Sequence, residues 1–167
     1  NHRLIKGNIL YELPLCEENS FDAVITSPPY ANRYDYTRTY ALELAFLDIG
    51  DDIFNLRQEL LSCTVENREK YNTLKDFYLE IGKREDFEKV ISIIQSTKAI
   101  AEVNEALLQR HKLGEINNKG VIKMIDQYFN ELAFLYFELF RTCKKGAMVA
   151  FVNDNVRYAG EVVNVDL

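Results

Sequence analysis

The chain has 167 residues, of which 47% are hydrophobic and 28% charged, and its formal net charge at pH 7 is −6. This composition is typical of a folded globular protein and excludes a disordered chain. No apolar run reaches the roughly 18 residues that cross a membrane, so we expect no membrane partner. The acidic balance argues against a protein held on nucleic acid mainly by bulk positive charge.

The cysteines and histidines are too scattered to suggest a metal site. Cys16, Cys63 and Cys143 form no Cys-x-x-Cys pair, and neither histidine lies near a cysteine in the sequence. We therefore expect no bound metal. We interpret the cysteines as small buried apolar residues and expect a reducing, cytoplasmic location.

Two short strands are predicted in the first 27 residues. Residues 3–8 are predicted as a strand that ends at Gly7-Asn8 and is followed by a turn or the start of a helix. Residues 21–26 form an apolar run that follows a polar stretch and is stopped by Pro28-Pro29. This pattern predicts a buried strand of a parallel sheet that ends by Ser27.

Helices are predicted over most of the next 90 residues. Residues 37–47 have a helical pattern, with Thr37 as the cap. Residues 51–113 are rich in Glu, Lys, Leu, Ile and Gln and lack proline, which predicts several helices with breaks near Gly82 and Gly114.

The last part of the chain contains the clearest helix and a second strand. Residues 121–143 carry apolar and aromatic side chains at three- and four-residue steps, which predicts a helix that Lys144-Lys145 follow and Gly146 stops. We expect its aromatic stripe to pack in the core. Residues 147–152 are predicted as another buried strand, and residues 162–165 as a further extended piece.

A strand, helix, strand order predicts the fold class α/β with a parallel sheet. The connection between the two strands is far longer than the roughly 12 residues that a crossover needs, so we interpret the excess as a helical insertion. The predicted domains are residues 1–50 and 121–167 for the sheet-bearing part and residues 51–120 for the insertion.

The segment Ser27-Pro28-Pro29-Tyr30 can hold an amino group. It follows a predicted strand of a parallel sheet, and ligands bind beyond the carboxyl ends of such strands. Two prolines remove two N–H donors and stiffen the backbone, leaving carbonyl acceptors and the Ser27 hydroxyl to receive the two hydrogens of an exocyclic amine. Tyr30 offers a flat face on which a base can stack.

Residues 22–30, Asp-Ala-Val-Ile-Thr-Ser-Pro-Pro-Tyr, resemble the catalytic motif of the S-adenosylmethionine-dependent DNA amino-methyltransferases, whose Ser form is most typical of the cytosine-N4 members. Two flanking segments strengthen the resemblance. Residues 6–14 are similar to the family's Gly-Asp-x-Leu…Leu-Pro segment, and residues 144–152 to the strand after its Lys-Pro-Gly-Gly turn. The resemblance covers about the first 47 and the last 40 residues.

The resemblance implies a partial Rossmann-like methyltransferase sheet, with S-adenosylmethionine as cofactor and DNA as partner. It implies that a DNA base, cytosine N4 before adenine N6, is methylated in a restriction-modification or related system. The implied catalytic residues are Ser27, Pro28, Pro29 and Tyr30; the cofactor-binding residues are Gly7, Asn8 and Thr26; and the DNA-binding residues are Arg33, Tyr34 and Arg38.

Several alternatives stay open at this point. Asn8 and Asp154 suit turns or caps as well as a site, and Arg33 and Arg38 suit a solvated surface as well as a phosphate. The family's Phe-x-Gly-x-Gly cofactor loop does not occur in the chain, so we expect a piece of a longer protein. A methyltransferase of RNA or protein, or a non-catalytic helical interaction fragment, remains the alternative function.

Overall fold

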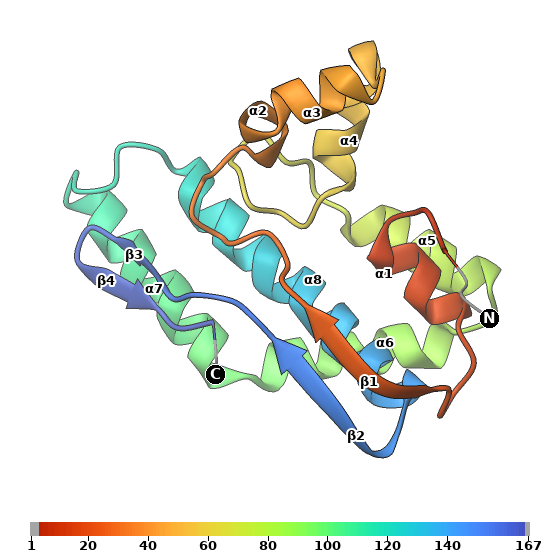
Figure 1. Cartoon of the computed structure of the whole chain (residues 1–167). Coiled ribbons are helices and arrows are strands. Elements are labelled where there is room, and N and C mark those ends of the chain that lie inside the picture. Colours follow the sequence, from red (N-terminus) through yellow and green to blue (C-terminus); the bar gives the residue numbers. More distant parts are fainter. Residues whose placement is uncertain (1–3, 166–167) are drawn as a thin grey trace. The chain divides into compact units, whose positions relative to one another are not determined.

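The computed structural model describes residues 4–165, which fall into two compact units (Figure 1). The first unit is built from the residues up to Ser27 and from Glu69–Thr97 and Asn130–Val152; the second is built from Pro28–Arg68, Lys98–Phe129 and the residues from Asn153 onward. The predicted domain boundaries after residues 50 and 120 remain a prediction.

The first unit contains a parallel strand pair among helices. Its elements are α1 (Ile9–Glu12), η1 (Leu13–Leu15), β1 (Phe21–Thr26), α5 (Tyr71–Glu80), α6 (Arg84–Ser96), β2 (Cys143–Phe151) and the carboxyl-terminal part of α8 (Gly120–Thr142). β1 and β2 run side by side in the same direction, as Figure 1 shows, with Ala23 opposite Met148 and Thr26 opposite Phe151. The parallel pairing of two distant segments confirms the α/β prediction.

The prediction that both strands are buried is wrong. Ile25 of β1 is 86% exposed, and Met148 of β2 is 72% exposed. A parallel strand is buried only when helices cover both faces of a wider sheet, and the parallel sheet of residues 4–165 has two strands. α8 contacts β2 through Tyr136 and Phe151, whose ring centroids are 5.0 Å apart.

The predicted strand at residues 3–8 is also wrong where the structure describes it, since residues 4–8 lie outside any strand. Residue 3 lies outside the described residues. A strand needs a neighbour for its N–H and C=O groups, and the described parallel sheet contains only β1 and β2. The predicted helix start is confirmed: Asn8 caps α1, and its Oδ1 accepts a hydrogen bond from the Leu10 amide at 3.0 Å.

The helix predicted at residues 121–143 is confirmed as α8. It ends at Thr142 rather than at Gly146, because β2 begins at Cys143 and contains both Lys144-Lys145 and Gly146. Gly146 has φ +85 and lies near the irregular register between Phe21 and Ala23. The aromatic stripe is core only in part, since Phe140 is 87% exposed.

An aromatic core and a buried ionic cluster hold the first unit together. Phe134 of α8 packs against Tyr78 of α5 and Phe87 of α6, with ring centroids 5.4 and 5.2 Å apart. The carboxylate of Glu138, which is 1% exposed, accepts hydrogen bonds from the Tyr78 hydroxyl at 3.0 Å and from Arg141 Nε at 2.6 Å. These contacts tie α8 to α5 and α6.

The second unit is mostly helical and ends in a hairpin. Its elements are α2 (Tyr36–Thr39), α3 (Ala41–Phe46), η2 (Gly50–Asp52), α4 (Ile53–Glu59), α7 (Lys98–Lys112), the amino-terminal part of α8, β3 (Val156–Tyr158) and β4 (Glu161–Val163). Leu107 of α7, Ile125 and Tyr128 of α8 and Val163 of β4 are almost fully buried. The hairpin pairs Val156 with Val163, so the extended piece predicted at residues 162–165 is confirmed for residues 162 and 163.

One predicted helix is interrupted. The helix predicted at residues 37–47 is broken at Tyr40, and its cap is Asp35 instead of Thr37. Several helices were predicted in residues 51–113, and two of them, α6 and α7, are separated by Thr97. The breaks predicted near Gly82 and Gly114 are confirmed, and both glycines have positive φ, the conformation that ends a helix most readily at glycine.

Candidate functional site

The segment Ser27–Tyr30, here called the proline corner, begins directly beyond β1. The last hydrogen bond of the strand pair joins the Val152 amide to the Thr26 carbonyl at 2.9 Å. The Ser27 side chain is exposed at this carboxyl end of the strand. The prediction that β1 ends by Ser27 is confirmed. The boundary between the two units falls after Ser27, so the rest of the proline corner is described within the second unit.

Pro28 is buried, whereas Pro29 and Tyr30 are half-buried. The Tyr30 carbonyl accepts a hydrogen bond from the Asn32 amide at 2.8 Å, which turns the chain immediately after the prolines. Ala31, the residue between them, is fully buried. The proline corner is therefore fixed at Pro28 and Ala31, and it keeps part of Pro29 and Tyr30 accessible.

Two tyrosine hydroxyls hold the backbone around Tyr30. The Tyr36 hydroxyl oxygen accepts a hydrogen bond from the Tyr30 amide at 3.2 Å, and the Tyr158 hydroxyl donates to the Ala31 carbonyl at 2.6 Å. Burial raises the pKa of Tyr158 to about 12, so its hydroxyl keeps its proton at neutral pH. Burial is also the main reason that the pKa of Tyr36 is raised.

Sequence analysis missed both tyrosines. Tyr36 lies in a tyrosine-rich stretch that the sequence displays, but nothing in the spacing shows which hydroxyl reaches back to Tyr30. Tyr158 lies 127 residues from Ala31, and a contact over that distance leaves no local signal.

Asp35 fixes the start of α2. Its carboxylate accepts hydrogen bonds from the Thr37 and Arg38 amides and pairs with Arg57 of α4 at 3.0 Å. Burial acts to raise the pKa of Asp35, but the Thr37 hydroxyl, the Arg57 charge and the two amides outweigh burial and lower the pKa.

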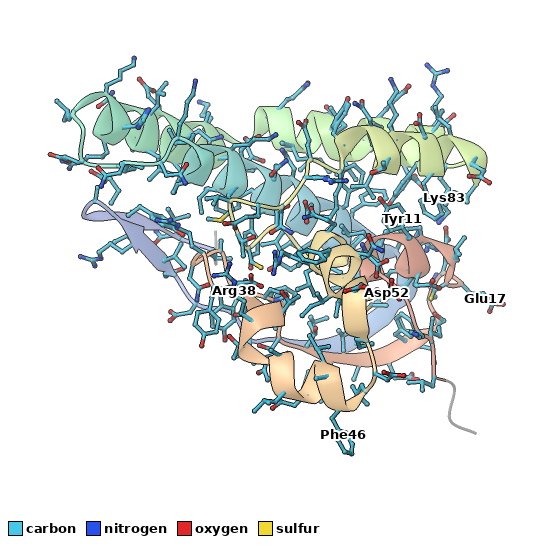
Figure 2. The ribbon with its side chains drawn as sticks, turned by 90° about the horizontal axis from the view of Figure 1, so that it is seen from above. Tyr11, Glu17, Arg38, Phe46, Asp52 and Lys83 are labelled. Atoms are coloured by element: carbon cyan, nitrogen blue, oxygen red, sulfur yellow. The ribbon has the colours of Figure 1, made fainter. Side chains whose placement is uncertain are left out.

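The predicted DNA-binding residues Arg33, Tyr34 and Arg38 lie on the segment that follows the proline corner, within the second unit. All three are exposed. The Arg38 side chain is 82% exposed and pairs with Asp35 at 3.3 Å, and Figure 2 labels it at the start of the helical segment. Their exposure leaves all three side chains accessible, and their role in DNA binding stays a prediction.

The predicted cofactor-binding residues lie on two segments of the first unit. Gly7 and Asn8 precede α1, whereas Thr26 ends β1. Asn8 Oδ1 serves as the helix cap. The Glu12 side chain lies against Gly7, and its Cγ is 2.6 Å from the position that a Cβ would take. The role of these three residues in cofactor binding stays a prediction.

The residues between β2 and β3 form no helix, strand or turn, and from Asn153 onward they belong to the second unit. Asn153 Nδ2 donates to the Tyr128 hydroxyl at 2.7 Å, and Asn153 Oδ1 accepts from the Asp154 amide at 2.9 Å. The Asp154 side chain is exposed. Whether Asp154 serves a site or only the local chain path stays a prediction.

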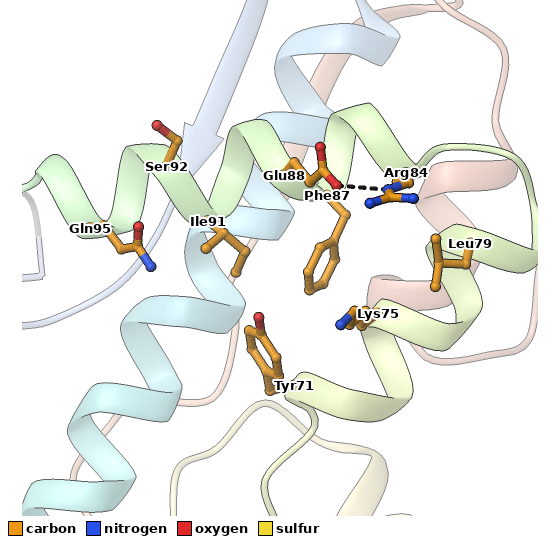
Figure 3. Close-up of a pocket in the computed structure, with 9 residues that line it drawn as sticks. All are labelled: Tyr71, Lys75, Leu79, Arg84, Phe87, Glu88, Ile91, Ser92 and Gln95. Carbon is orange, nitrogen blue, oxygen red and sulfur yellow. Dashed lines mark hydrogen bonds and ion pairs between the residues drawn. The ribbon is translucent and has the colours of Figure 1, made fainter.

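The first unit contains two hollows. One, of about 440 Å³, lies between α5 and α6 and is lined by Tyr71, Phe87 and the exposed ion pair of Arg84 and Glu88, among others (Figure 3). The other, of about 720 Å³, lies between the end of α8 and the start of β2. Neither contains a residue that the sequence predicted as catalytic.

Within residues 4–165, no cluster of three or more His, Cys, Asp or Glu side chains is arranged to hold a metal ion. No helix in the same part of the chain is long and apolar enough to cross a membrane. Of the three cysteines, only Cys63 is buried, whereas Cys16 and Cys143 are half-buried. The interpretation of the cysteines as buried apolar residues therefore holds for one of them.

No protein-family profile and no solved structure matches the chain. The chain is 42% identical over 165 residues to the type II methyltransferase M.AvaI of Nostoc sp. and of Anabaena variabilis, which is 98% of this chain and 32% of each relative. It is 55% identical over 166 residues, 99% of its length, to the type II methyltransferase M.BsoBI of Geobacillus stearothermophilus and spans 33% of that relative. The chain is thus similar along nearly all its length to about a third of proteins named type II methyltransferases.

Proposed function

We propose that this chain carries the base-binding corner of a DNA methyltransferase. The enzyme transfers a methyl group from S-adenosylmethionine to the exocyclic amino nitrogen of a DNA base, with cytosine N4 preferred over adenine N6, and works in a restriction-modification system. The observation that carries this proposal is the position of Ser27-Pro28-Pro29-Tyr30 at the carboxyl end of a parallel strand. The 55% identity to a type II methyltransferase supports it.

The proline corner supplies acceptors for an amine. An exocyclic amino group has two hydrogens to donate, and the Ser27 hydroxyl and the carbonyls around Ser27 and Pro28 receive them. The proline rings fix φ and leave no N–H there to compete. The exposed side chain of Ser27 favours this role. Held in this way, the amino nitrogen is oriented toward the methyl group, and orientation accelerates a reaction of a weak nucleophile.

Tyr30 provides the stacking face for the base. A methyltransferase must extrude its target base from the duplex to reach the amino group, and the extruded base is held by stacking and hydrogen bonds. The half-buried position of Tyr30 leaves part of its ring accessible. Arg33, Tyr34 and Arg38 follow on an exposed stretch, where they would contact the DNA backbone.

S-adenosylmethionine, when bound, supplies the electrophilic methyl group. The residues proposed to hold it are Gly7, Asn8 and Thr26, and Asn8 also caps α1 through its carboxamide oxygen. A cytoplasmic location fits the proposed substrate.

A non-catalytic role of the isolated chain is favoured by two observations. The chain spans about a third of its relatives, and it lacks the Phe-x-Gly-x-Gly loop. Calorimetry with the 167-residue chain and S-adenosylmethionine distinguishes a catalytic chain from a non-catalytic one. A chain that is catalytic by itself must bind the cofactor, whereas a non-catalytic fragment need not.

The proposed function is tested by methyl transfer from labelled S-adenosylmethionine to DNA, using the complete polypeptide that carries this chain. Tyr30→Ala should lower the rate roughly tenfold to a hundredfold, because base–aromatic stacking is lost. Ser27→Ala should lower it roughly threefold to tenfold through the loss of one hydrogen bond.

Matched controls are Ser96→Ala at the end of α6 and Tyr40→Ala after α2, both exposed residues outside the proposed site. These variants should retain the wild-type rate. Unchanged transfer in both Ser27→Ala and Tyr30→Ala would rule out the roles assigned to the proline corner. Labelling of RNA or protein in place of DNA would overturn the proposed substrate.

A further inference from the structure

We infer that Tyr36 and Tyr158 are positioning residues of the proposed reaction, because their hydroxyls clamp the backbone on both sides of the Tyr30 ring. This inference rests on the proposed function and extends it to two residues that the catalytic motif does not contain. Both residues, and the part of the proline corner that they hold, belong to the second unit.

The clamp acts on peptide groups that flank the Tyr30 side chain. Tyr36 accepts the Tyr30 N–H at 3.2 Å, and Tyr158 donates to the Ala31 carbonyl at 2.6 Å. Between these two anchors the Tyr30 carbonyl accepts from the Asn32 amide at 2.8 Å. The preceding prolines have fixed φ. The direction of the Tyr30 Cα–Cβ bond, and hence of its ring, is therefore set by contacts on both sides.

Tyr36 is itself held in place. It is the first residue of α2, and Asp35 caps that helix through the Thr37 and Arg38 amides. The Asp35 carboxylate pairs with Arg57 of α4 at 3.0 Å. The Tyr36 ring also packs edge-on against the ring of Tyr34, with centroids 5.4 Å apart. A short helix that would fray alone is thus anchored to a second helix.

Tyr158 is held by the hairpin at the other end of the chain. It lies in β3 opposite Glu161 of β4. Glu161 Oε1 accepts from Arg110 of α7 through Nε at 2.7 Å and also pairs with Nη2 of the same guanidinium. β3 and β4 lie beside α7 in Figure 1, in agreement with these contacts. Tyr158 thus lies in a hairpin that is fixed to α7, and its hydroxyl contacts a fully buried residue, Ala31.

This arrangement predicts that the two hydroxyls act on rate more than on binding. The hydroxyl of Tyr158 is bonded to the buried Ala31 backbone, and that of Tyr36 to the Tyr30 backbone, so neither is assigned to hold DNA or cofactor. Releasing either anchor lets the Tyr30 ring shift, and a displacement of about 1 Å from the productive geometry can lower a rate roughly a hundredfold. The affinity for DNA depends mainly on phosphate contacts elsewhere.

The test uses Tyr36→Phe and Tyr158→Phe, each of which removes one hydroxyl and keeps the ring. Single-turnover methyl transfer is measured in the complete polypeptide with saturating DNA and S-adenosylmethionine, and the Kd for DNA is measured by fluorescence anisotropy without cofactor. The expected result is a rate lowered about tenfold or more in each variant, with the Kd for DNA within about twofold of wild type. Amide hydrogen exchange at Tyr30 should be faster in Tyr36→Phe than in wild type.

Two tyrosine variants serve as controls. Tyr40→Phe changes an exposed tyrosine after α2, and Tyr78→Phe removes a buried hydroxyl bonded to Glu138 in the first unit. Tyr78→Phe should lower the melting temperature and leave the single-turnover rate unchanged, which separates lost stability from lost positioning. If Tyr158→Phe fails to fold, Tyr36→Phe decides.

The inference is overturned if the wild-type enzyme is active and Tyr36→Phe transfers methyl groups at the wild-type rate, or if its rate falls only in proportion to weaker DNA binding. It is also overturned if Tyr78→Phe slows the reaction as much as the two clamp variants. A wild-type polypeptide that methylates no amino nitrogen of DNA would instead refute the proposed function, so the two failures are distinguishable.

Discussion

Replacing Arg141 tests the ionic cluster that holds the first unit. Arg141 Nε donates to Glu138 at 2.6 Å, and the two side chains are only 12% and 2% exposed. Arg141 Nη2 also donates to the carbonyls of Leu13, Pro14 and Cys16 at 3.2, 3.2 and 2.9 Å. One guanidinium thus joins the end of α8 to η1 and its C-cap Cys16, so Arg141→Ala should loosen both.

The loss of folding stability expected for Arg141→Ala follows from these contacts. Breaking a buried ion pair by removing one partner destabilises a protein by about 3–5 kcal/mol. In Arg141→Ala, Lys83 Nζ still lies 3.8 Å from Glu138 and the Tyr78 hydroxyl still donates to it, which favours a loss of stability at the lower end of this range. The lost hydrogen bonds to the three carbonyls increase the loss of stability. We expect about 4 kcal/mol for Arg141→Ala, which for a chain of this size lowers the melting temperature by roughly 8–16 °C.

The assay is urea unfolding followed by circular dichroism and by tyrosine fluorescence, since the chain has no tryptophan. Arg84→Ala is the matched control, because Arg84 Nε donates to Glu88 at 2.7 Å but the two side chains are 73% and 59% exposed. An exposed pair of this kind contributes little to stability, so this variant should unfold like wild type. If Arg141→Ala and Arg84→Ala lose the same free energy of unfolding, burial does not decide how much an ion pair stabilises this protein, and the expectation is refuted.

Two further predictions concern the second unit. The pKa of Asp35 lies below its ordinary value of 3.8 because the Thr37 hydroxyl, the Arg57 charge and nearby amides outweigh burial. The free energy of unfolding that Asp35 adds relative to Asp35→Asn should therefore be constant above roughly pH 5 and be lost below roughly pH 4. Urea titrations of both proteins at several pH values measure this difference. Leu107→Ala, at a fully buried position of α7, should destabilise the protein by about 2–5 kcal/mol, whereas Leu108→Ala, at a position 36% exposed, should have a much smaller effect in the same titration; equal effects would contradict the packing described for α7.

The sequence predicted those elements whose cause is local. The apolar spacing of residues 121–143 gave the position of α8 within a residue at each end, and two prolines stopped β1 where predicted. The parallel pairing of β1 with β2 followed from the order of elements. The helix break predicted near Gly82 was also correct, and Gly82 has a positive φ.

The errors arose where structure depends on distant neighbours. A strand was expected at residues 3–8 from local apolar residues, but strand formation needs a paired edge, and the cap at Asn8 favours a helix instead. Burial of β1 was expected from its apolar composition, although Ile25 is exposed because the described sheet has only two strands. Asp35 was not recognised as the cap of α2 because Thr37, a residue type that also caps helices, lies at the start of the apolar helical pattern.

Only the contiguous part of the candidate site could be predicted from the sequence. The proline corner is contiguous in sequence, so residues 27–30 could be identified from their types and their place after a strand. The contacts that hold it come from Tyr36 and Tyr158, and the second of these lies at the far end of the chain. Their role became visible only from the hydrogen-bond geometry.

If the oxygens of the proline corner hold the amino group of a DNA base, the methylated product identifies that base. The product is identified by mass spectrometry of nucleosides from DNA incubated with S-adenosylmethionine and the complete polypeptide that carries this chain. We expect N4-methylcytosine, formed more slowly by Ser27→Ala and Tyr30→Ala. A methyl group found on cytosine carbon 5, or N4-methylcytosine formed at the wild-type rate by both variants, would contradict it.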